Sequence, residues 1–128
     1  MSGKNPFYDF KDFIDACSKG NVSLWKSATE GAEKFFNLKT KKDLLEFIAN
    51  EGLTQLEFIN SASWKENPKP EKEILIDAYK FRSGGTLGYI AFFYSPYTQN
   101  WIIKSFKQNL DTNVALKEAI NKALQKKQ

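Results

Sequence analysis

Apolar residues recur at helical spacing through the first half of the chain. The earliest run lies between residues 7 and 20, and its apolar positions share one face of a helix: Phe10, Phe13, Ile14 and Cys17. Gly20 follows this run and is a suitable C-cap, because glycine readily adopts the left-handed conformation in which many helices end. The pattern therefore predicts a first amphipathic helix, preceded by a loose leader over residues 1–6.

Capping signals place further helices after the first. Ser27 is a candidate N-cap for a second helix that ends near Asn37. Thr40 heads a third helix, since it stands three residues before Asp43 in an acidic variant of the capping box. Residues 54–59 are expected to form a short fourth helix that starts at Thr54. Residues 7–60 are therefore predicted to be mostly helical.

The hydrophobic period changes beyond residue 60. Residues 61–72 contain Pro68, Pro70 and dense charge, so a charged loop is expected there. Residues 73–109 contain runs of strand length that are rich in β-branched and aromatic residues: ILIDAYKF, GYIAFFY and NWIIKSF. The turn-rich segments between these runs are short, which favours an antiparallel meander of three strands.

The end of the chain returns to helical spacing. Asp111 or Thr112 is a candidate N-cap, and residues 111–126 carry an apolar side of alanine, isoleucine and leucine. A chain of 128 residues with this order of elements is expected to form one α+β domain over residues 1–128. We expect N-terminal helices packed on a small antiparallel three-stranded sheet, together with a C-terminal helix.

The composition excludes several kinds of site. The chain has no histidine and one cysteine, so a Ser-His-Asp triad, a histidine zinc site and an internal disulfide cannot form. Cys17 lies on the apolar side of the first predicted helix and is interpreted as a core residue. The carboxylates show no metal-ligand spacing, so neither a metal nor another cofactor is expected. No apolar run approaches about 18 residues, so we expect no membrane span and a cytoplasmic protein.

A basic and aromatic surface is the main functional candidate. The net charge of +4 is mild, so the positions of the cations matter more than their number. In a regular strand, Ser105 and Lys107 share a face with Trp101, whereas Lys104 points to the other face. Aromatic rings can stack on bases while cations neutralise phosphate, so such strands suit single-stranded RNA. The candidate residues are Tyr79, Lys80, Arg82, Tyr89, Tyr94, Tyr97, Lys104 and Lys107.

Short segments between residues 10 and 109 resemble one family in the same order: GNVSLWKSATEGAEKF, EGLTQLEFINSASW, DAYKFRSGGTLGY and IIKSFKQN. They are similar to the motility quorum-sensing regulator (MqsR) toxins, which are ribosome-independent mRNA interferases with a RelE-like fold. The matching positions are Gly20-Asn21-Val22, Ser27-Ala28, Leu53-Thr54, Phe58-Ile59-Asn60-Ser61, Asp77-Ala78-Tyr79, Tyr89 and Ser105-Phe106-Lys107. Asn60 and Ile76 depart from the family, which has lysine and glutamine at these positions.

The resemblance implies a metal-independent endoribonuclease of a toxin–antitoxin system, with RNA as substrate and a cognate antitoxin protein as partner. It implies catalytic roles for Tyr89 and Lys107, which match functional positions of the family. A lysine or a tyrosine can assist proton transfer from the ribose 2′-hydroxyl, and a lysine can stabilise the pentacoordinate phosphate. The basic surface supplies the expected RNA contacts: Tyr79, Lys80, Arg82, Lys104 and Tyr94.

Two alternatives to a toxin stay open. A non-catalytic interaction or regulatory module that kept the fold would explain why Asn60 and Ile76 replace functional residues of the family. An unrelated α+β domain would instead use the tyrosines of the strands as core residues and the lysines as solubilising edge residues.

Overall fold

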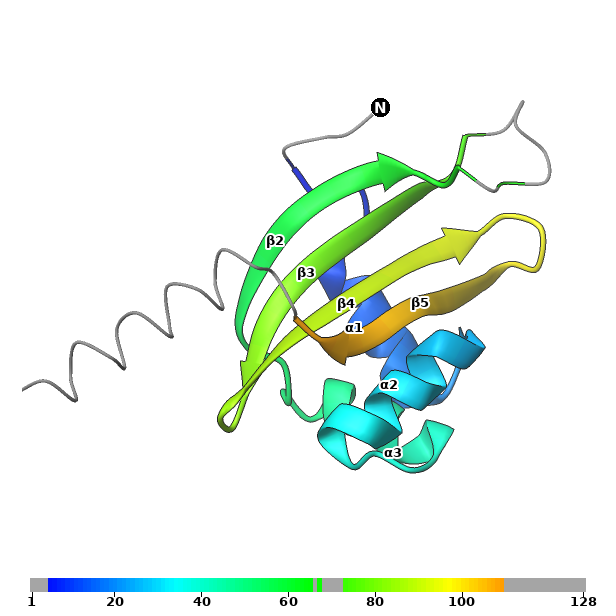
Figure 1. Cartoon of the computed structure of the whole chain (residues 1–128). Coiled ribbons are helices and arrows are strands. Elements are labelled where there is room, and N and C mark those ends of the chain that lie inside the picture. The colour runs from blue at the N-terminus through cyan, green and yellow to red at the C-terminus, as the bar shows by residue number, and fades with distance from the viewer. Residues whose placement is uncertain (1–4, 66, 68–72, 110–128) are drawn as a thin grey trace, which may run out of the picture.

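The computed structural model describes residues 5–65, 67 and 73–109. Along this part of the chain the elements are α1 (Phe10–Lys19), β1 (Val22–Leu24), α2 (Lys26–Phe36), α3 (Lys41–Ala49), β2 (Thr54–Ser63), β3 (Leu75–Ser83), β4 (Thr86–Ser95) and β5 (Asn100–Gln108). The strands form one five-stranded sheet in the order β1-β5-β4-β3-β2. β1 runs parallel to β5, and the other neighbours are antiparallel. Figure 1 shows α1 behind the sheet, with α2 and α3 beside it.

The expected α+β class is confirmed, but the expected three-stranded, RelE-like sheet is wrong. β3, β4 and β5 form the predicted meander, and one further strand joins each of its edges. β1 lies where a short linker was expected, and β2 lies where the short fourth helix was expected. The predicted C-terminal helix over residues 111–126 lies outside the described residues, as does most of the predicted leader.

Irregular backbone explains why β2 resembles a helix in the sequence. Its pairing with β3 shifts register twice, between Thr54 and Glu57 and between Phe58 and Asn60. Gln55, inside the first shift, has a left-handed φ of 49°. Bulges of this kind add residues to one strand and interrupt the alternation of its two faces. The remaining apolar positions then mimic helical spacing.

The predicted helix ends agree well with the structure. The Thr40 hydroxyl accepts a hydrogen bond from the backbone N–H of Asp43 at 3.0 Å, as the capping box requires. Gly20 has a left-handed φ of 76° at the end of α1, and Asn37 ends α2 with a φ of 56°. The start of α2 differs from the prediction, because Trp25 occupies the N-cap position and provides no side-chain cap.

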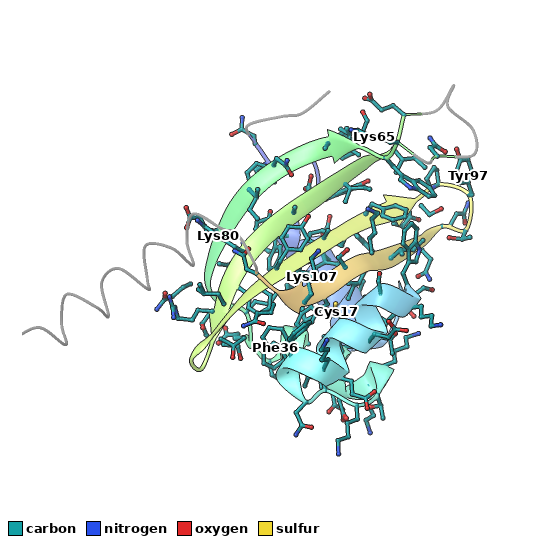
Figure 2. The ribbon with its side chains drawn as sticks, in the orientation of Figure 1. Cys17, Phe36, Lys65, Lys80, Tyr97 and Lys107 are labelled. Carbon is teal, nitrogen blue, oxygen red and sulfur yellow. The ribbon has the colours of Figure 1, made fainter. Side chains whose placement is uncertain are left out.

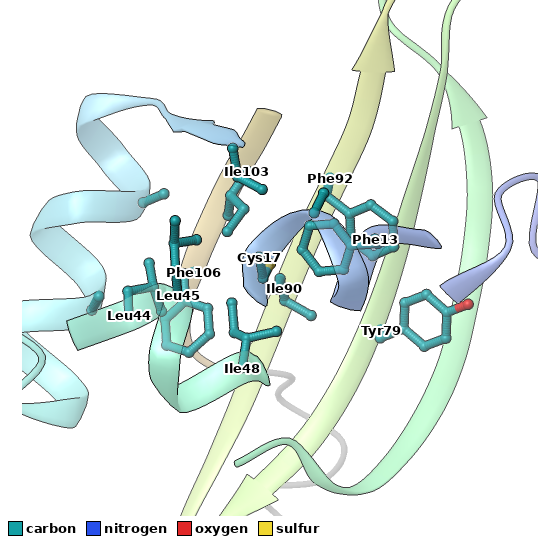
Figure 3. Packing of buried hydrophobic residues seen from close by; sticks show 14 of the residues in the cluster. Phe13, Cys17, Leu44, Leu45, Ile48, Tyr79, Ile90, Phe92, Ile103 and Phe106 are labelled. Atoms are coloured by element: carbon teal, nitrogen blue, oxygen red, sulfur yellow. The ribbon is translucent and has the colours of Figure 1, made fainter. Parts of the chain in front are cut away.

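The core lies between the helices and one face of the sheet (Figure 3). The ring of Phe13 from α1 stacks on Phe92 of β4, with a centroid separation of 3.9 Å and an interplanar angle of 4°. The ring of Tyr79 of β3 lies parallel to that of Phe92, with a centroid separation of 5.9 Å. Cys17 is 3% exposed within this cluster, which confirms its interpretation as a core residue. Burial raises the pKa of the Cys17 thiol to about 12, so the thiol is protonated and unreactive at neutral pH.

Candidate nucleic-acid interface

A bulge in β5 brings two lysines to the same face of the sheet. Ser105 pairs with Ala91, whereas Ile103 pairs with Phe92, so Lys104 is an additional residue in the strand. Ile103 is fully buried on the helix side of the sheet, as is Phe106 three residues later. Strict alternation would place Lys104 and Lys107 on opposite faces. The bulge instead places both on the face that no described helix covers, which we call the open face.

Tyr89 stands between two lysines on this open face. The backbone register pairs it with Lys80 of β3 on one side and with Lys107 of β5 on the other. The Lys107 ammonium lies 5.4 Å from the centroid of the Tyr89 ring. Lys80 forms an ion pair with Glu57 at 3.4 Å, whereas no ion pair joins Lys107 to a carboxylate of the described residues. Figure 2 shows Lys107 in front of the sheet and Lys80 toward β2.

Burial changes the chemistry of the Tyr89 phenol. Tyr89 is half-buried, and desolvation raises its pKa above the ordinary value of 10.0. The phenol is therefore uncharged at neutral pH and can donate a hydrogen bond. It is a poor general base, because a base must spend a useful fraction of the time deprotonated.

A row of small side chains forms the floor of a hollow next to Tyr89. The register of the sheet places Asn60, Ala78, Ala91 and Ser105 side by side across β2, β3, β4 and β5. Small side chains leave room above the sheet, and the hollow measures about 480 Å³. Its lining residues are Trp25, Ser27, Asn60, Ala62, Ser63, Trp64, Lys65, Ile76, Ala78, Tyr89, Ala91, Lys104 and Ser105.

Aromatic side chains close one end of the hollow. Phe93 is fully buried although it belongs to the open face, because two tryptophans cover it. The ring of Trp64 lies 5.2 Å from Phe93 and 5.7 Å from Trp25. The Lys104 ammonium lies 5.8 Å from the centroid of the Trp25 ring. A cation and a partly exposed indole are therefore neighbours at this end.

Helix α2 fixes the part of β5 that carries these lysines. The Ser27 hydroxyl donates a hydrogen bond to the carbonyl oxygen of Lys104 at 2.9 Å. One turn later, α2 approaches β5 so closely that a Cβ atom on Gly31 would overlap the carbonyl oxygen of Phe106. Glycine at this position therefore lets α2 pack directly on the backbone of β5. There α2 covers the edge of β5 beyond the residues that pair with β1.

The charge of the open face favours an anionic ligand. The hollow is lined by Lys65 and Lys104, and its lining contains no carboxylate. A second hollow of about 900 Å³ beside α1 has the opposite character. Its charged lining residues are Asp9, Asp12, Asp15 and Lys19. Of these two hollows, the smaller one therefore has the charge that suits an anionic ligand.

The structure gathers some of the expected site residues and separates others. Tyr89, Lys80, Lys104 and Lys107 lie on the open face. Arg82 lines a separate hollow of about 180 Å³ together with Lys80. Tyr97 lies in the β4–β5 turn, and its hydroxyl donates a hydrogen bond to Asn67, which lies between β2 and β3.

Two expected RNA contacts lie on the helix side of the sheet. Tyr79 is 5% exposed and packs against Phe92, and burial together with Asp77 and Asp9 raises its pKa to about 12. Tyr94 is 36% exposed and lines the acidic hollow, with its ring 5.4 Å from Trp101. Neither tyrosine contributes to the hollow of the open face.

Trp25 and Trp64 are the site residues that sequence reasoning missed. The sequence carries no signal for Trp25, because the predicted N-cap was Ser27 and the N-cap position of Trp25 is visible only in the structure. Asn60 and Ile76, which replace the family's lysine and glutamine, both line the hollow.

Comparisons with known proteins provide no further assignment. No family model, no curated protein and no solved structure matches the chain. Within residues 5–65, 67 and 73–109, histidine, cysteine and carboxylate side chains form no group that could hold a metal ion. The helices of these same segments are too short or too polar to cross a membrane.

Proposed function

We propose that the protein binds single-stranded RNA on the open face of its sheet. The observation that carries this proposal is the bulge in β5, which places Lys104 and Lys107 on the same face as Tyr89. The two ammonium groups neutralise successive phosphates, and the hollow beside Lys104 admits an unstacked nucleotide. The absence of carboxylates from its lining removes the repulsion that would oppose a polyanion.

A single strand fits this face better than a duplex. The aromatic side chains line a hollow, whereas a double helix keeps the faces of its bases stacked inside the duplex. Unpaired bases expose their faces and can stack on such rings, as they do on the sheets of other single-strand binders.

Cleavage of the bound RNA is a second candidate function, favoured by the position of Tyr89. Its uncharged phenol can donate a proton to the departing 5′-oxygen, while the Lys107 ammonium stabilises the pentacoordinate phosphate. In this step the 2′-oxygen bonds to phosphorus, the P–O5′ bond breaks, and solvent accepts the 2′-hydroxyl proton. Asn60 and Ile76 offer no cation or base, so we expect the reaction to be slow.

The proposed partner and location follow from an RNA substrate and from the resemblance to toxins. A toxin needs a cognate antitoxin, and an antitoxin that inhibits this protein would cover the hollow with acidic residues. RNA as the substrate places the protein in the cytoplasm.

Replacing both Lys104 and Lys107 by alanine is expected to weaken binding to a ten-nucleotide RNA by about 10- to 100-fold at low salt. The slope of log affinity against log salt should fall in magnitude by about 1.4, since each contact to single-stranded nucleic acid contributes about 0.7. Fluorescence anisotropy at several salt concentrations measures both quantities.

Lys34→Ala is the matched control for this experiment. Lys34 also lies over an aromatic ring, 5.3 Å from Phe35, but it belongs to helix α2 outside the hollow. Its removal should change the affinity by less than about twofold and leave most of the salt slope. Equal effects of the control and the double variant would overturn the proposed interface.

Tyr89→Phe separates cleavage from binding. The substitution removes the phenol O–H and keeps the ring, so the cleavage rate should fall at least about 100-fold while RNA affinity changes little. Gel analysis of RNA and of DNA with the same sequence provides the readout, since DNA lacks the 2′-hydroxyl and must stay intact. If wild-type protein binds RNA but leaves it uncut, the cleavage step is wrong and the binding function stands.

A further inference from the structure

Trp25 occupies a position of α2 at which tryptophan does not stabilise the helix. It is the N-cap residue of α2, with extended φ and ψ of −73° and 155°, and its side chain caps no backbone N–H. Serine, threonine, aspartate and asparagine are preferred there because their oxygens accept such a bond. A residue that departs from this N-cap preference and does not stabilise the helix points to a role other than capping.

The Trp25 backbone is held in place firmly. Its N–H donates to the carbonyl of Ile103 at 3.0 Å, and its own carbonyl accepts from Ala28 at 3.0 Å. Its ring meets Phe93 edge-on, with centroids 6.0 Å apart and an interplanar angle of 82°. The indole is therefore fixed by β5, α2 and the sheet, and it still retains part of its surface exposed beside the hollow.

Trp64 supplies a second and independent observation. Its indole Nε1 is buried and has no hydrogen-bond acceptor among the described residues. A buried donor without a partner is rare in folded proteins, because it loses its bond to water and gains nothing. Trp64 lines the hollow, so a small rotation of its indole would present this donor to a ligand that carries acceptor atoms.

These observations fit a binding site for a flat heterocycle that carries hydrogen-bond acceptors. Bases provide a π-face for the Trp25 indole together with ring nitrogens and carbonyl oxygens that accept hydrogen bonds. The Lys104 ammonium, 5.8 Å from the Trp25 ring, then lies where the phosphate attached to that base is expected. An aliphatic ligand would contact only the aromatic rings. It would leave both the Lys104 ammonium and the Trp64 indole N–H without a partner.

We propose that Trp25 and Trp64 form a subsite for one nucleobase, at the end of the hollow away from Lys107. This inference rests on the proposed RNA-binding function and deepens it. It divides the hollow into a base subsite at the tryptophans and a phosphate subsite at Lys104, with the strand continuing toward Tyr89 and Lys107.

The test compares two ligands of equal charge. One is an eight-nucleotide oligouridylate, and the other is an abasic ribose-phosphate oligomer of the same length. Wild-type protein should bind the oligouridylate about 5- to 150-fold more tightly, the range expected for stacking of one base. Trp25→Leu should lose most of this preference and bind the abasic oligomer as wild type does, whereas Lys104→Ala should weaken both ligands alike.

Tyr94→Leu is the matched control, since it removes an exposed aromatic side chain from the opposite face. It should leave the preference for bases unchanged. Photocrosslinking of wild-type protein to oligo-5-bromouridylate supplies evidence that needs no variant, because the crosslinked peptide should contain Trp25 or Trp64. The thermal midpoint of each variant shows whether it is folded.

The possible failures are distinguishable. If neither oligomer binds at low salt, the RNA-binding function fails and takes the subsite with it. If both bind equally, with crosslinks outside Trp25 and Trp64 and with affinity lowered by Lys104→Ala, the base subsite alone is overturned. A preference for bases that Tyr94→Leu removes and Trp25→Leu keeps would place base recognition on the other face.

Discussion

Replacing Asp77 by alanine is expected to lower the free energy of unfolding by about 3 to 5 kcal/mol. The Asp77 side chain is fully buried in β3. Its two oxygens accept hydrogen bonds from the backbone N–H groups of Phe7 at 3.1 Å and Tyr8 at 2.9 Å. Hydrogen bonds to a charged acceptor are stronger than neutral ones, and alanine would leave both donors without a partner. Urea unfolding followed by far-ultraviolet circular dichroism measures the loss.

Tyr8→Phe is the control for this prediction. It removes the Tyr8 hydroxyl in the same region, which donates a hydrogen bond to the carbonyl oxygen of Leu75 at 2.7 Å. The expected cost is about 1 kcal/mol, as for one neutral hydrogen bond. A cost of Asp77→Ala no larger than that of Tyr8→Phe would show that the carboxylate does not anchor the segment before α1.

Raising the pH from 9 to 12 is expected to remove about 4 kcal/mol of stability through Cys17 alone. Burial raises the pKa of this thiol from 9.0 to about 12. A group whose pKa is higher in the folded state stabilises the fold at pH values below its unfolded pKa. Above pH 9 the unfolded thiol ionises while the folded thiol does not, so stability falls until about pH 12.

Cys17→Ala isolates this effect. Urea unfolding at closely spaced pH values should show a falling free energy of unfolding for wild type between pH 9 and 10, with a slope that approaches about 1.4 kcal/mol per pH unit. The variant should show a smaller fall, because it retains only the part that comes from tyrosines whose pKa values burial also raises, Tyr79 and Tyr89 among them. The difference between the two curves belongs to the thiol. Parallel curves for the two proteins would mean that the folded thiol ionises as freely as the unfolded one.

The sequence predicts the helix ends and the meander because these depend on local chemistry. Thr40 with Asp43 fits a capping box, and Gly20 supplies a left-handed C-cap. The aromatic and β-branched runs of β3 to β5 likewise favour strands, and the short turns between them favour pairing of neighbours in the chain. The edge strands differ, because β1 and β2 depend on partners far away in the sequence.

Bulges limit what alternation can predict about the site. A regular β5 would separate Lys104 from Lys107, and a regular β2 would keep Asn60 on the face of Phe58. In the structure β5 gains one residue and β2 gains one between Phe58 and Asn60 besides its earlier bulge, and the open face acquires Lys104, Lys107 and Asn60 together. The position of a bulge depends on pairing across the sheet, so the sequence of one strand does not reveal it.

The sequence also does not show on which face of the sheet each tyrosine lies. Tyr79 and Tyr89 belong to adjacent strands and have similar surroundings in the sequence. The register of the sheet decides that Tyr79 packs on Phe92 in the core and that Tyr89 faces Lys107. Residue type alone therefore overestimates the size of the proposed RNA surface.

An amide NMR titration with a single-stranded RNA decamer tests the proposed interface most directly. Binding on the open face predicts that the largest chemical-shift changes map to Ala78, Tyr89, Ser105 and Lys107, around the hollow and along the adjoining row. Residues of the acidic hollow, Asp12, Asp15 and Thr98, should change little. The largest changes at these three residues, or no change at an RNA concentration that saturates anisotropy, would contradict an RNA site on the open face.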